Sequence, residues 1–496
     1  MKRRTFIAYT GMGVCSSLAG TARPSAAKPE SAASNRPSIL FIMTDQQHAG
    51  MLSCAGNKDL KTPALDQLAA TGIRFEKAYV PNPVCCPCRF SLQTGLMPSH
   101  IGASDNPSGD GAPISDSVAA NSLGPLFQRA GYDCAYGGKV HVPIALWDKV
   151  KENSWNYLCK WERDKLADAC SDYLGQPRDK PFLLFASFVN PHDVCYMAYF
   201  KYSSDDLING RFQIFNKTLK ENNLGPKPFK SEQDLDEFVA NHCPRLPANY
   251  DVPENEPEAI TTKYLEARDF RMHVRQHWDE KMWRLHRWMY ARLTERVDKN
   301  IGKILRALQQ SEAADNTLIV FTSDHGDMDA AHRTEHKSIP YEEAVRVPFI
   351  MSYPGRIPAG TVNQQHFISN GLDLLPTLCD YGQIAAPPKL PGRSVRPLAE
   401  GRPADGWRET LVSESQNARM LCHGAYKYTI YDGGKNRECL VDRQNDPGEM
   451  KNIADDPRLA HQLNQMRKLL CDWVETVDDR IGRKYVISPG AAVKSA

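Results

Sequence analysis

The chain has 496 residues, of which 41% are hydrophobic and 24% are charged. This composition excludes a disordered protein, and the length allows a large core with a smaller second unit. Lysine and arginine (61) nearly balance aspartate and glutamate (59), which leaves a net charge of +2. The charge therefore gives no reason to expect a nucleic acid or an anionic membrane surface as a partner.

Residues 1–27 have the pattern of an export signal. Basic residues 2–4 precede a short apolar stretch, residues 6–14, and an alanine-rich segment. The pair Arg3-Arg4 resembles a twin-arginine signal, and the alternative is a basic tail without structure. The apolar stretch is too short to span a bilayer, and no later segment is long enough. We therefore expect a periplasmic or secreted protein without a membrane span.

Apolar runs alternate with helical patterns along the next 350 residues. Residues 62–72 have a candidate N-cap, a proline at the first helical position and a final glycine, and residues 293–308 have apolar side chains at helical spacing. This alternation predicts an α/β fold with a large, mostly parallel central sheet flanked by helices. The predicted strands are residues 37–43, 132–136, 182–189, 317–321 and 348–351.

The domain boundaries follow from composition. We place a main domain at residues 36–385, with a polar and irregular insertion at residues 195–290 that shapes access to the site. A proline-rich stretch, residues 387–406, marks the boundary to a smaller α+β subdomain at residues 395–496. Its predicted elements are strands at residues 410–413, 426–431 and 438–442 and a helix at residues 459–474.

Ionisable side chains follow several of the predicted strands. In open α/β sheets, ligands bind at the carboxyl ends of the strands, so we expect these side chains to form one site. The residues are Asp45, Lys139, His141, His192, Asp324 and His325.

A cysteine-rich segment, Cys85-Cys86-Pro87-Cys88-Arg89, precedes Leu92-Gln93-Thr94-Gly95. The spacing of Cys85 and Cys88 also fits a redox pair or half of a zinc site. Against zinc, no second Cys or His pair follows at short spacing, and against redox chemistry, the surroundings do not resemble a thioredoxin unit. The segment resembles the signature of the sulfatase family, Cys-x-Pro-x-Arg followed by Leu-x-Thr-Gly.

This resemblance implies an alkaline-phosphatase-like fold and a modified nucleophile. In the family, a maturase, the formylglycine-generating enzyme, oxidises the cysteine to formylglycine, so Cys85 would become an aldehyde. One hydroxyl of the hydrated aldehyde attacks sulfur, and the sulfated enzyme then collapses by elimination through the second hydroxyl. The reaction would hydrolyse a small-molecule or oligosaccharide sulfate ester.

The resemblance also implies a metal site made of Asp45, Gln46, Cys85, Asp324 and His325. Hard oxygen ligands favour Ca²⁺, with Mg²⁺ as the alternative, although a histidine is an unusual ligand for Ca²⁺. Without the resemblance, Asp45 would be interpreted as a helix cap or turn residue, and Asp324-His325 as an ordinary loop.

Five further residues match catalytic positions of the family. Arg89 would anchor the hydrated aldehyde and, with Lys139 and Lys337, neutralise the sulfate. His141 would take the proton of the second hydroxyl, and His192 with Lys337 would protonate the leaving oxygen. The alternatives are solvated lysines and structural histidines.

Three functions remain open at this stage: a sulfatase acting on a sulfated sugar or an aryl sulfate, a phosphonate monoester or phosphodiester hydrolase of the same superfamily, and a binding protein in which Cys85 keeps its thiol. We expect a carbohydrate sulfate as substrate. A cluster near the end of the insertion could stack on a sugar ring or pack a helix against the sheet. Its members are Trp278, Trp283, His286, Arg287 and Trp288.

Overall fold

The structure is a computed structural model that describes residues 36–106, 113–161, 163, 165–199, 203–221 and 229–491. It divides the chain into two units, Met1–Asn35 and Arg36–Ala496, and the second is the subject here. The predicted export signal, residues 1–27, lies outside the described residues.

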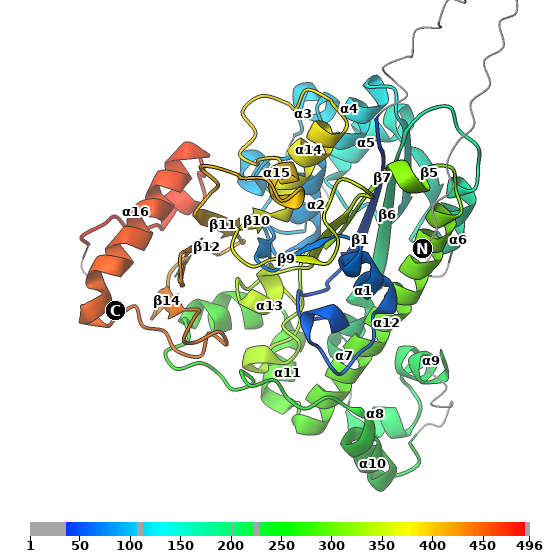
Figure 1. Cartoon of the computed structure of the whole chain (residues 1–496). Coiled ribbons are helices and arrows are strands. Elements are labelled where there is room, and N and C mark those ends of the chain that lie inside the picture. Colours follow the sequence, from blue (N-terminus) through cyan, green and yellow to red (C-terminus); the bar gives the residue numbers. More distant parts are fainter. Residues whose placement is uncertain are drawn as a thin grey trace, which may run out of the picture. The chain divides into compact units, whose positions relative to one another are not determined.

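The core of this unit is an eight-stranded sheet with the order β5-β4-β6-β1-β7-β8-β2-β9 (Figure 1). The central strand β1 pairs in parallel with β6 and with β7, whereas β8 runs antiparallel to β7 and β2. The predicted α/β fold with a mostly parallel sheet is therefore confirmed. The strands are β1 Ser38–Asp45, β2 Ile73–Phe75, β4 Asp133–Gly138, β5 Asn156–Cys159, β6 Phe182–Pro191, β7 Thr317–Ser323, β8 Phe349–Ser352 and β9 Thr361–Asn363.

Helices cover both faces of the sheet because the central strands are apolar on both faces. Successive side chains of a strand point to opposite faces. Accordingly, Ile39 and Phe41 join one core with α2, α4, α5 and α14, while Leu40 and Ile42 join the other with α1, α6 and α12. These helices are α1 Pro63–Ala70, α2 Cys85–Thr94, α4 Leu123–Arg129, α5 Ile144–Ser154, α6 Leu166–Leu174, α12 Glu280–Gln309 and α14 Asn370–Tyr381.

The described part of residues 195–290 is mostly helical, so the expectation of an irregular insertion is wrong. Its helices are short, and all except η5 bury a separate apolar cluster against α12, which the polar composition of the segment concealed. They are α7 Tyr196–Tyr199, α8 Ser204–Ile208, α9 Gln213–Glu221, α10 Glu232–His242, the π-helix η5 Ile260–Leu265 and α11 Asp269–His277.

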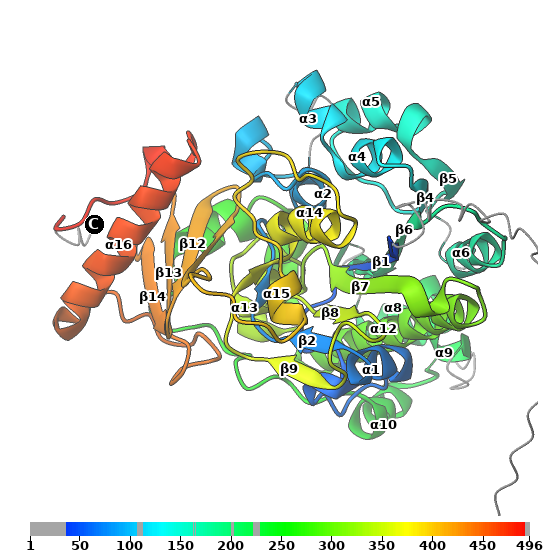
Figure 2. The same cartoon turned by 45° about the horizontal axis from the view of Figure 1, so that its top comes forward.

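The C-terminal part is a four-stranded antiparallel sheet with one helix, which confirms the predicted α+β fold. Helix α16 lies along the sheet (Figure 2). Leu463 and Leu470 of this helix share an apolar cluster with Tyr428 and Ile430 of the sheet. The sequence did not reveal the second strand, β12. The elements are β11 Thr410–Glu414, β12 Ala418–His423, β13 Tyr426–Tyr431, β14 Glu438–Asp442 and α16 Ala460–Thr476.

Short elements connect these parts. They are the strands β3 Ala78–Tyr79 and β10 Ile368–Ser369, the α-helices α3 Asp116–Ala120, α13 Glu342–Val345 and α15 Arg396–Ala399, and the 3₁₀ turns Ser53–Ala55, Pro98–Ile101, His192–Cys195, Ala314–Asn316, Ala331–Arg333, Pro457–Leu459 and Gly482–Lys484. Among the helices that the structure describes, none combines the length and apolar character needed to cross a membrane.

Candidate active site

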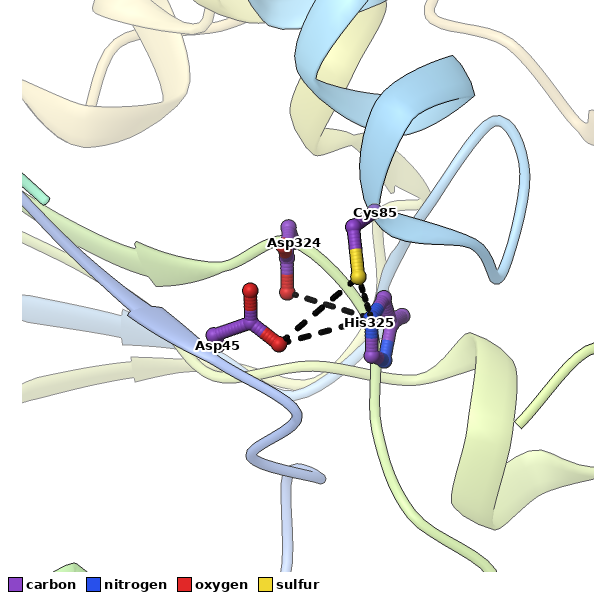
Figure 3. A group of neighbouring side chains, drawn as sticks. All are labelled: Asp45, Cys85, Asp324 and His325. Atoms are coloured by element: carbon purple, nitrogen blue, oxygen red, sulfur yellow. Dashed lines mark hydrogen bonds and ion pairs between the residues drawn. The ribbon is translucent and has the colours of Figure 1, made fainter. Parts of the chain in front are cut away.

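The carboxyl ends of the parallel strands bring the predicted residues together. Asp45 is the last residue of β1, and Asp324 follows β7 directly. Cys85 begins α2 and points toward both carboxylates (Figure 3). This convergence follows from the topology, because neighbouring parallel strands end at the same edge of the sheet.

Arg89 is the centre of a buried hydrogen-bond network. Its Nε donates to Asp324 Oδ2 at 2.7 Å, and its Nη2 donates to Asp45 Oδ2 at 2.9 Å. Its Nη1 donates to the backbone oxygen of Lys139 at 2.7 Å and to Ser187 Oγ at 2.9 Å. All three guanidinium nitrogens thus bind groups other than Cys85, so Arg89 orients the two carboxylates. Ser187 was not predicted, because a serine inside an apolar strand carries no distinctive sequence signal.

The sulfur of Cys85 lies among charged groups. Sγ is 3.0 Å from Lys337 Nζ, 3.1 Å from His325 Nε2, 3.7 Å from Lys139 Nζ and 3.8 Å from Asp45 Oδ1. Burial and the Asp45 carboxylate raise the pKa of the Cys85 thiol. The positive charges of Lys139, Lys337 and His325 outweigh them and hold this pKa well below its usual value of 9.0. The site therefore favours an anion at this position.

Cys88 has a different environment. Its side chain, on α2, lies in the apolar core. Burial, followed by Asp324, raises the pKa of its thiol well above 9.0. Cys85 and Cys88 both carry free thiols, and Cys88 is not part of the ligand cluster around Cys85. A redox pair or a zinc half-site made by these two cysteines is therefore not supported.

Asp45, Cys85, Asp324 and His325 form a compact buried cluster. Each offers one ligand-type atom, and these atoms all lie within 4.8 Å of one another (Figure 3). Nδ1 of His325 is 2.8 Å from the backbone oxygen of Gly326, so this nitrogen carries the donated proton. Nε2 then faces the cluster, 3.5 Å from Asp324 Oδ1 and 3.8 Å from Asp45 Oδ1.

The protonation behaviour of this cluster fits a cation site. Burial, followed by the nearby Asp45, raises the pKa of Asp324. Burial lowers the pKa of His325, but Asp324 and Cys85 together raise it further, so the net shift is upward. Surroundings that draw a proton onto His325 also attract a divalent cation, which replaces that proton. The donor set of two carboxylates and one imidazole fits such an ion.

Gln46 lies beside the cluster in a left-handed backbone conformation, with φ of 70°. Its backbone N–H donates to Asp324 Oδ1 at 3.2 Å, and its side-chain Oε1 accepts from Lys337 Nζ at 3.0 Å. Its Nε2 donates to Asp327 Oδ2 at 2.7 Å. Asp327 was not predicted, although it belongs to the same Asp324–Asp327 segment. It fixes the amide so that Oε1 faces Lys337.

Both predicted lysines are buried, which excludes the alternative of solvated side chains. Lys139 is 3% exposed, and its Nζ lies 2.5 Å from Asp45 Oδ2. Lys337 is 5% exposed. Burial lowers the pKa of Lys337, but Cys85 and Asp45 raise it further, so the net shift is upward and the ammonium stays charged.

His141 and His192 line the cavity next to Cys85. Burial and Lys337 hold the pKa of His192 well below 6.5, and its Nδ1 lies 3.5 Å from Cys195 Sγ. Nδ1 of His141 is buried and has no hydrogen-bond partner among the described residues. Trp161, which was not predicted, is 51% exposed, and its ring lies 6.1 Å from that of His141.

The cavity has a volume of about 400 Å³ and receives walls from three parts of the chain. The main domain contributes Cys85 and the two histidines, the segment around η5 and α11 contributes one wall, and the C-terminal sheet contributes residues 415–418 and Tyr431. The sequence did not predict the residues of the last two walls, because their positions depend on packing between distant segments.

The aromatic cluster near the start of α12 does not reach this cavity. Trp278, Trp283 and Trp288 are buried in the apolar cluster of the insertion. His286 is also buried, and Arg287 pairs with Asp329 at 3.2 Å. Packing of a helix is therefore the correct interpretation, and stacking of these residues on a sugar is wrong.

The comparison with known proteins agrees with the fold. The family profile described as Sulfatase matches residues 37–384, and the profile described as N-sulphoglucosamine sulphohydrolase, C-terminal, matches residues 331–476. The chain therefore belongs to the sulfatase family of sulfuric ester hydrolases.

Particular relatives cover almost the whole chain. A Delta 4,5-hexuronate-2-O-sulfatase of Bacteroides thetaiotaomicron is 31% identical over 470 residues, which span 90% of this chain and 90% of that protein. The solved structure of a 2-O GAG sulfatase has a TM-score of 0.74 at 27% identity and covers 91% of this chain and 95% of its own. A phosphonate monoester hydrolase of Agrobacterium radiobacter shares the fold, with a TM-score of 0.69 at 20% identity over 89% of this chain and 96% of its own.

Proposed function

We propose that this sulfatase removes sulfate from a sulfated carbohydrate and that its nucleophile is a formylglycine hydrate made from Cys85. The observation that carries the proposal is the position of Cys85 Sγ, 3.0 Å from Lys337 Nζ and 3.1 Å from His325 Nε2, at the wall of the cavity. Relatives named for a hexuronate sulfate and for a 2-O GAG sulfate support the substrate class.

Asp45, Asp324 and His325, with Gln46 beside them, would hold one divalent cation, for which we propose Ca²⁺, with Mg²⁺ as the alternative. When bound, such an ion neutralises the carboxylates and polarises an oxygen of the nucleophile or the sulfate. Arg89 positions Asp45 and Asp324 for this purpose through the contacts at 2.9 and 2.7 Å.

The lysines supply the positive charge that a sulfate requires. Lys139 and Lys337 are buried, and their ammonium groups approach Cys85 Sγ at 3.7 and 3.0 Å. Groups that are fixed in place before the reaction stabilise the charge of the transition state without reorganising. We therefore propose that these two lysines bind the non-bridging sulfate oxygens.

The histidines would handle protons. His192 is neutral at pH 7 in the free site, because burial and Lys337 lower its pKa. A bound sulfate ester adds negative charge beside it and raises this pKa, so His192 would take up a proton on binding and donate it to the leaving oxygen. His141, whose buried Nδ1 has no described partner, would accept the proton of the second hydroxyl.

Trp161 supports a carbohydrate as substrate. This exposed indole stands beside His141, and its face is 5.7 Å from Lys139 Nζ. Aromatic rings of this kind offer an apolar face to a sugar while leaving polar neighbours free to bind its hydroxyls.

The test is sulfate release from a panel of sulfated sugars and an aryl sulfate, compared with the matched aryl phosphate and a phosphonate monoester. We expect sulfate release, and we expect Cys85→Ala to lose at least about 10³-fold in kcat, because the covalent nucleophile is removed. The matched control is Cys86→Ala, one residue along the same helix.

Each other outcome selects a different function. Faster release of phosphate or phosphonate than of sulfate favours the phosphohydrolase. An intact thiol at Cys85, read by peptide mass in protein from a host that has a formylglycine-generating enzyme, together with sugar binding but no sulfate release, favours the binding protein. An aldehyde at Cys85 supports the maturase as a partner.

We also propose export by the twin-arginine route. The evidence is the sequence of residues 1–27 alone. Fusion of these residues to a reporter that is active only outside the cytoplasm tests the proposal, with Arg3→Lys and Arg4→Lys together as the control that should retain the reporter inside.

A further inference from the structure

One wall of the cavity carries more positive than negative side chains. Lys263, Arg268 and Arg271 line this wall, and all three come from the segment of η5 and the start of α11. Lys263 is paired, since its Nζ lies 3.0 Å from Asp432 Oδ2. Asp105 is the one carboxylate among the described residues that line the cavity.

Arg271 is held in a fixed orientation. Its guanidinium stacks at 3.9 Å on the ring of Tyr264, and its Nη1 donates to the backbone oxygen of Tyr264 at 3.2 Å. Its Nε is buried and has no hydrogen-bond partner in the described part of the chain. No described carboxylate forms an ion pair with Arg271, although its positive charge partly offsets the rise in pKa that burial causes at Glu335. An arginine is always charged, and a preorientated guanidinium with unused N–H groups is suited to bind an oxyanion.

Arg268 adds a second guanidinium to the same wall. It precedes α11 as the N-cap residue and is exposed. Its side chain forms no hydrogen bond or ion pair with any residue that the structure describes. Two arginines three positions apart, one fixed and one free to adjust, together match the planar, two-oxygen edge of a carboxylate or a sulfate.

We propose that Arg271 and Arg268 form a second anion subsite, which binds a carboxylate or a second sulfate on the same sugar whose sulfate ester lies at Cys85. The inference deepens the proposed function and rests on it. The cavity volume of about 400 Å³ is near the lower end of the ~300–1,000 Å³ typical of small-molecule sites, so both anions belong to one small ligand. The preferred substrates are therefore sulfated sugars with two negative charges.

The test measures by calorimetry, with Ca²⁺ present, how tightly each probe binds. The protein is the full-length chain carrying Cys85→Ala, so that no probe is hydrolysed. The first pair of probes is glucuronate and glucose, each with one sulfate at C2 or C3. The second pair is glucosamine 2-N,6-O-disulfate and N-acetylglucosamine 6-sulfate. Within each pair the probes differ by one negative charge away from the shared sulfate.

We expect the doubly charged probe of at least one pair to bind more tightly, and Arg271→Met to weaken it by about 10- to 100-fold, as for loss of a charge-assisted contact. Binding of the singly charged probe should change by less than about threefold. Arg271→Lys should give an intermediate affinity, because it keeps the charge but loses the planar fork. Arg268→Met, at an exposed position, should show the same selectivity with a smaller effect.

Lys435→Met is the matched control, since it removes one exposed positive charge beside η5 but outside the cavity wall. An effect confined to the glucuronate pair identifies a carboxylate, and one confined to the disulfate pair identifies a second sulfate. The proposal is overturned if neither pair shows a preference for the second charge, or if Arg271→Met weakens both members of a pair equally. Failure of the proposed function is seen separately, as absence of sulfate release by the wild-type chain.

Discussion

The buried cluster around Cys85 and the cavity wall formed by η5 and α11 hold their charges in opposite ways. At the carboxyl ends of β1 and β7, Arg89 and Lys139 are buried and bound to Asp45 and Asp324 at 2.5 to 2.9 Å. On the wall formed by η5 and α11, Arg271 is half-buried and pairs with no described carboxylate. The first arrangement fixes the reacting groups, and the second leaves binding capacity for a ligand. Under the proposed function, the chemistry and the choice of substrate would depend on different kinds of contact.

The largest expected effect comes from breaking the buried side. Asp324→Asn should abolish binding of the cation and lower kcat by roughly 10³-fold or more, because it removes a charged ligand and a partner of Arg89. Metal content by elemental analysis and sulfate release measure the two effects. Treatment with a chelator should reproduce the loss in the wild type, and Ca²⁺ should restore it.

The control for this variant is Asp298→Asn. Asp298 is similarly buried, but it accepts from the backbone N–H groups of Ala64 and Leu65 and is not part of the cluster of candidate metal ligands. Metal binding should survive in this control. Full metal content and activity in Asp324→Asn would contradict the assignment of the site.

A second test separates the role of Arg89 in stability from its role in catalysis. Arg89→Lys should lower the free energy of unfolding by roughly 3 kcal/mol, because a lysine cannot satisfy two buried carboxylates and two further acceptors. Its kcat should also fall at temperatures where it remains folded. Chemical denaturation and sulfate release measure the two quantities.

Arg419→Lys is the matched comparison. Arg419 is also buried, and it holds Asp479 in the C-terminal part with one contact at 2.9 Å. A similar loss of stability without a loss of kcat is expected for it. If the two variants lose activity equally below their melting temperatures, Arg89 has only a structural role.

A third test uses pH. Burial, followed by Asp479, raises the pKa of Glu414 to about 7, from 4.5. The folded protein therefore binds a proton that the unfolded chain releases, so this contribution to stability is complete below about pH 4.5 and is lost as the pH rises to about 7. Glu414→Gln should remove roughly 1–3 kcal/mol of this pH dependence, measured by denaturation at pH 5 and pH 8.

Glutamine can still accept from the backbone N–H of Ser99 and can donate to its hydroxyl, so Glu414→Gln should be no less stable than the wild type at pH 8. An unchanged difference in stability between the two pH values would show that Glu414 ionises normally. Activity should stay the same, since Glu414 belongs to the sheet β11–β14 and does not line the cavity.

The smallest expected effect concerns Trp161. Trp161→Ala should raise KM for sugar sulfates by about three- to tenfold and leave kcat nearly unchanged, as for loss of one aromatic contact. Ile144→Ala, at another exposed apolar position near the start of α5, is the control. Equal effects of both variants, or a change in kcat alone, would argue against stacking on the substrate.

The sequence predicted the residues around Cys85 but not the wall of the cavity that holds Arg271. The residue types and spacing of Cys85 and Arg89 are dictated by the reaction, and strands that are apolar on both faces end in residues such as Asp45 and Asp324. Such features are local, so they remain visible without a structure. The segment around Arg271 has no comparable pattern. Its polar composition predicts irregular structure, whereas the segment forms η5 and α11.

By itself the sequence determined the α/β fold, the C-terminal α+β part and the family, because each depends on local periodicity or on a short motif. Only the tertiary structure decided that Arg89 binds the carboxylates, that Trp283 is packed into the core, and that Arg271 and Gln416 face the same cavity as Cys85. Several of these relations join segments more than a hundred residues apart, such as Arg89 with Asp324 and Cys85 with Arg271. They depend on how helices and loops pack, which no short stretch of sequence specifies.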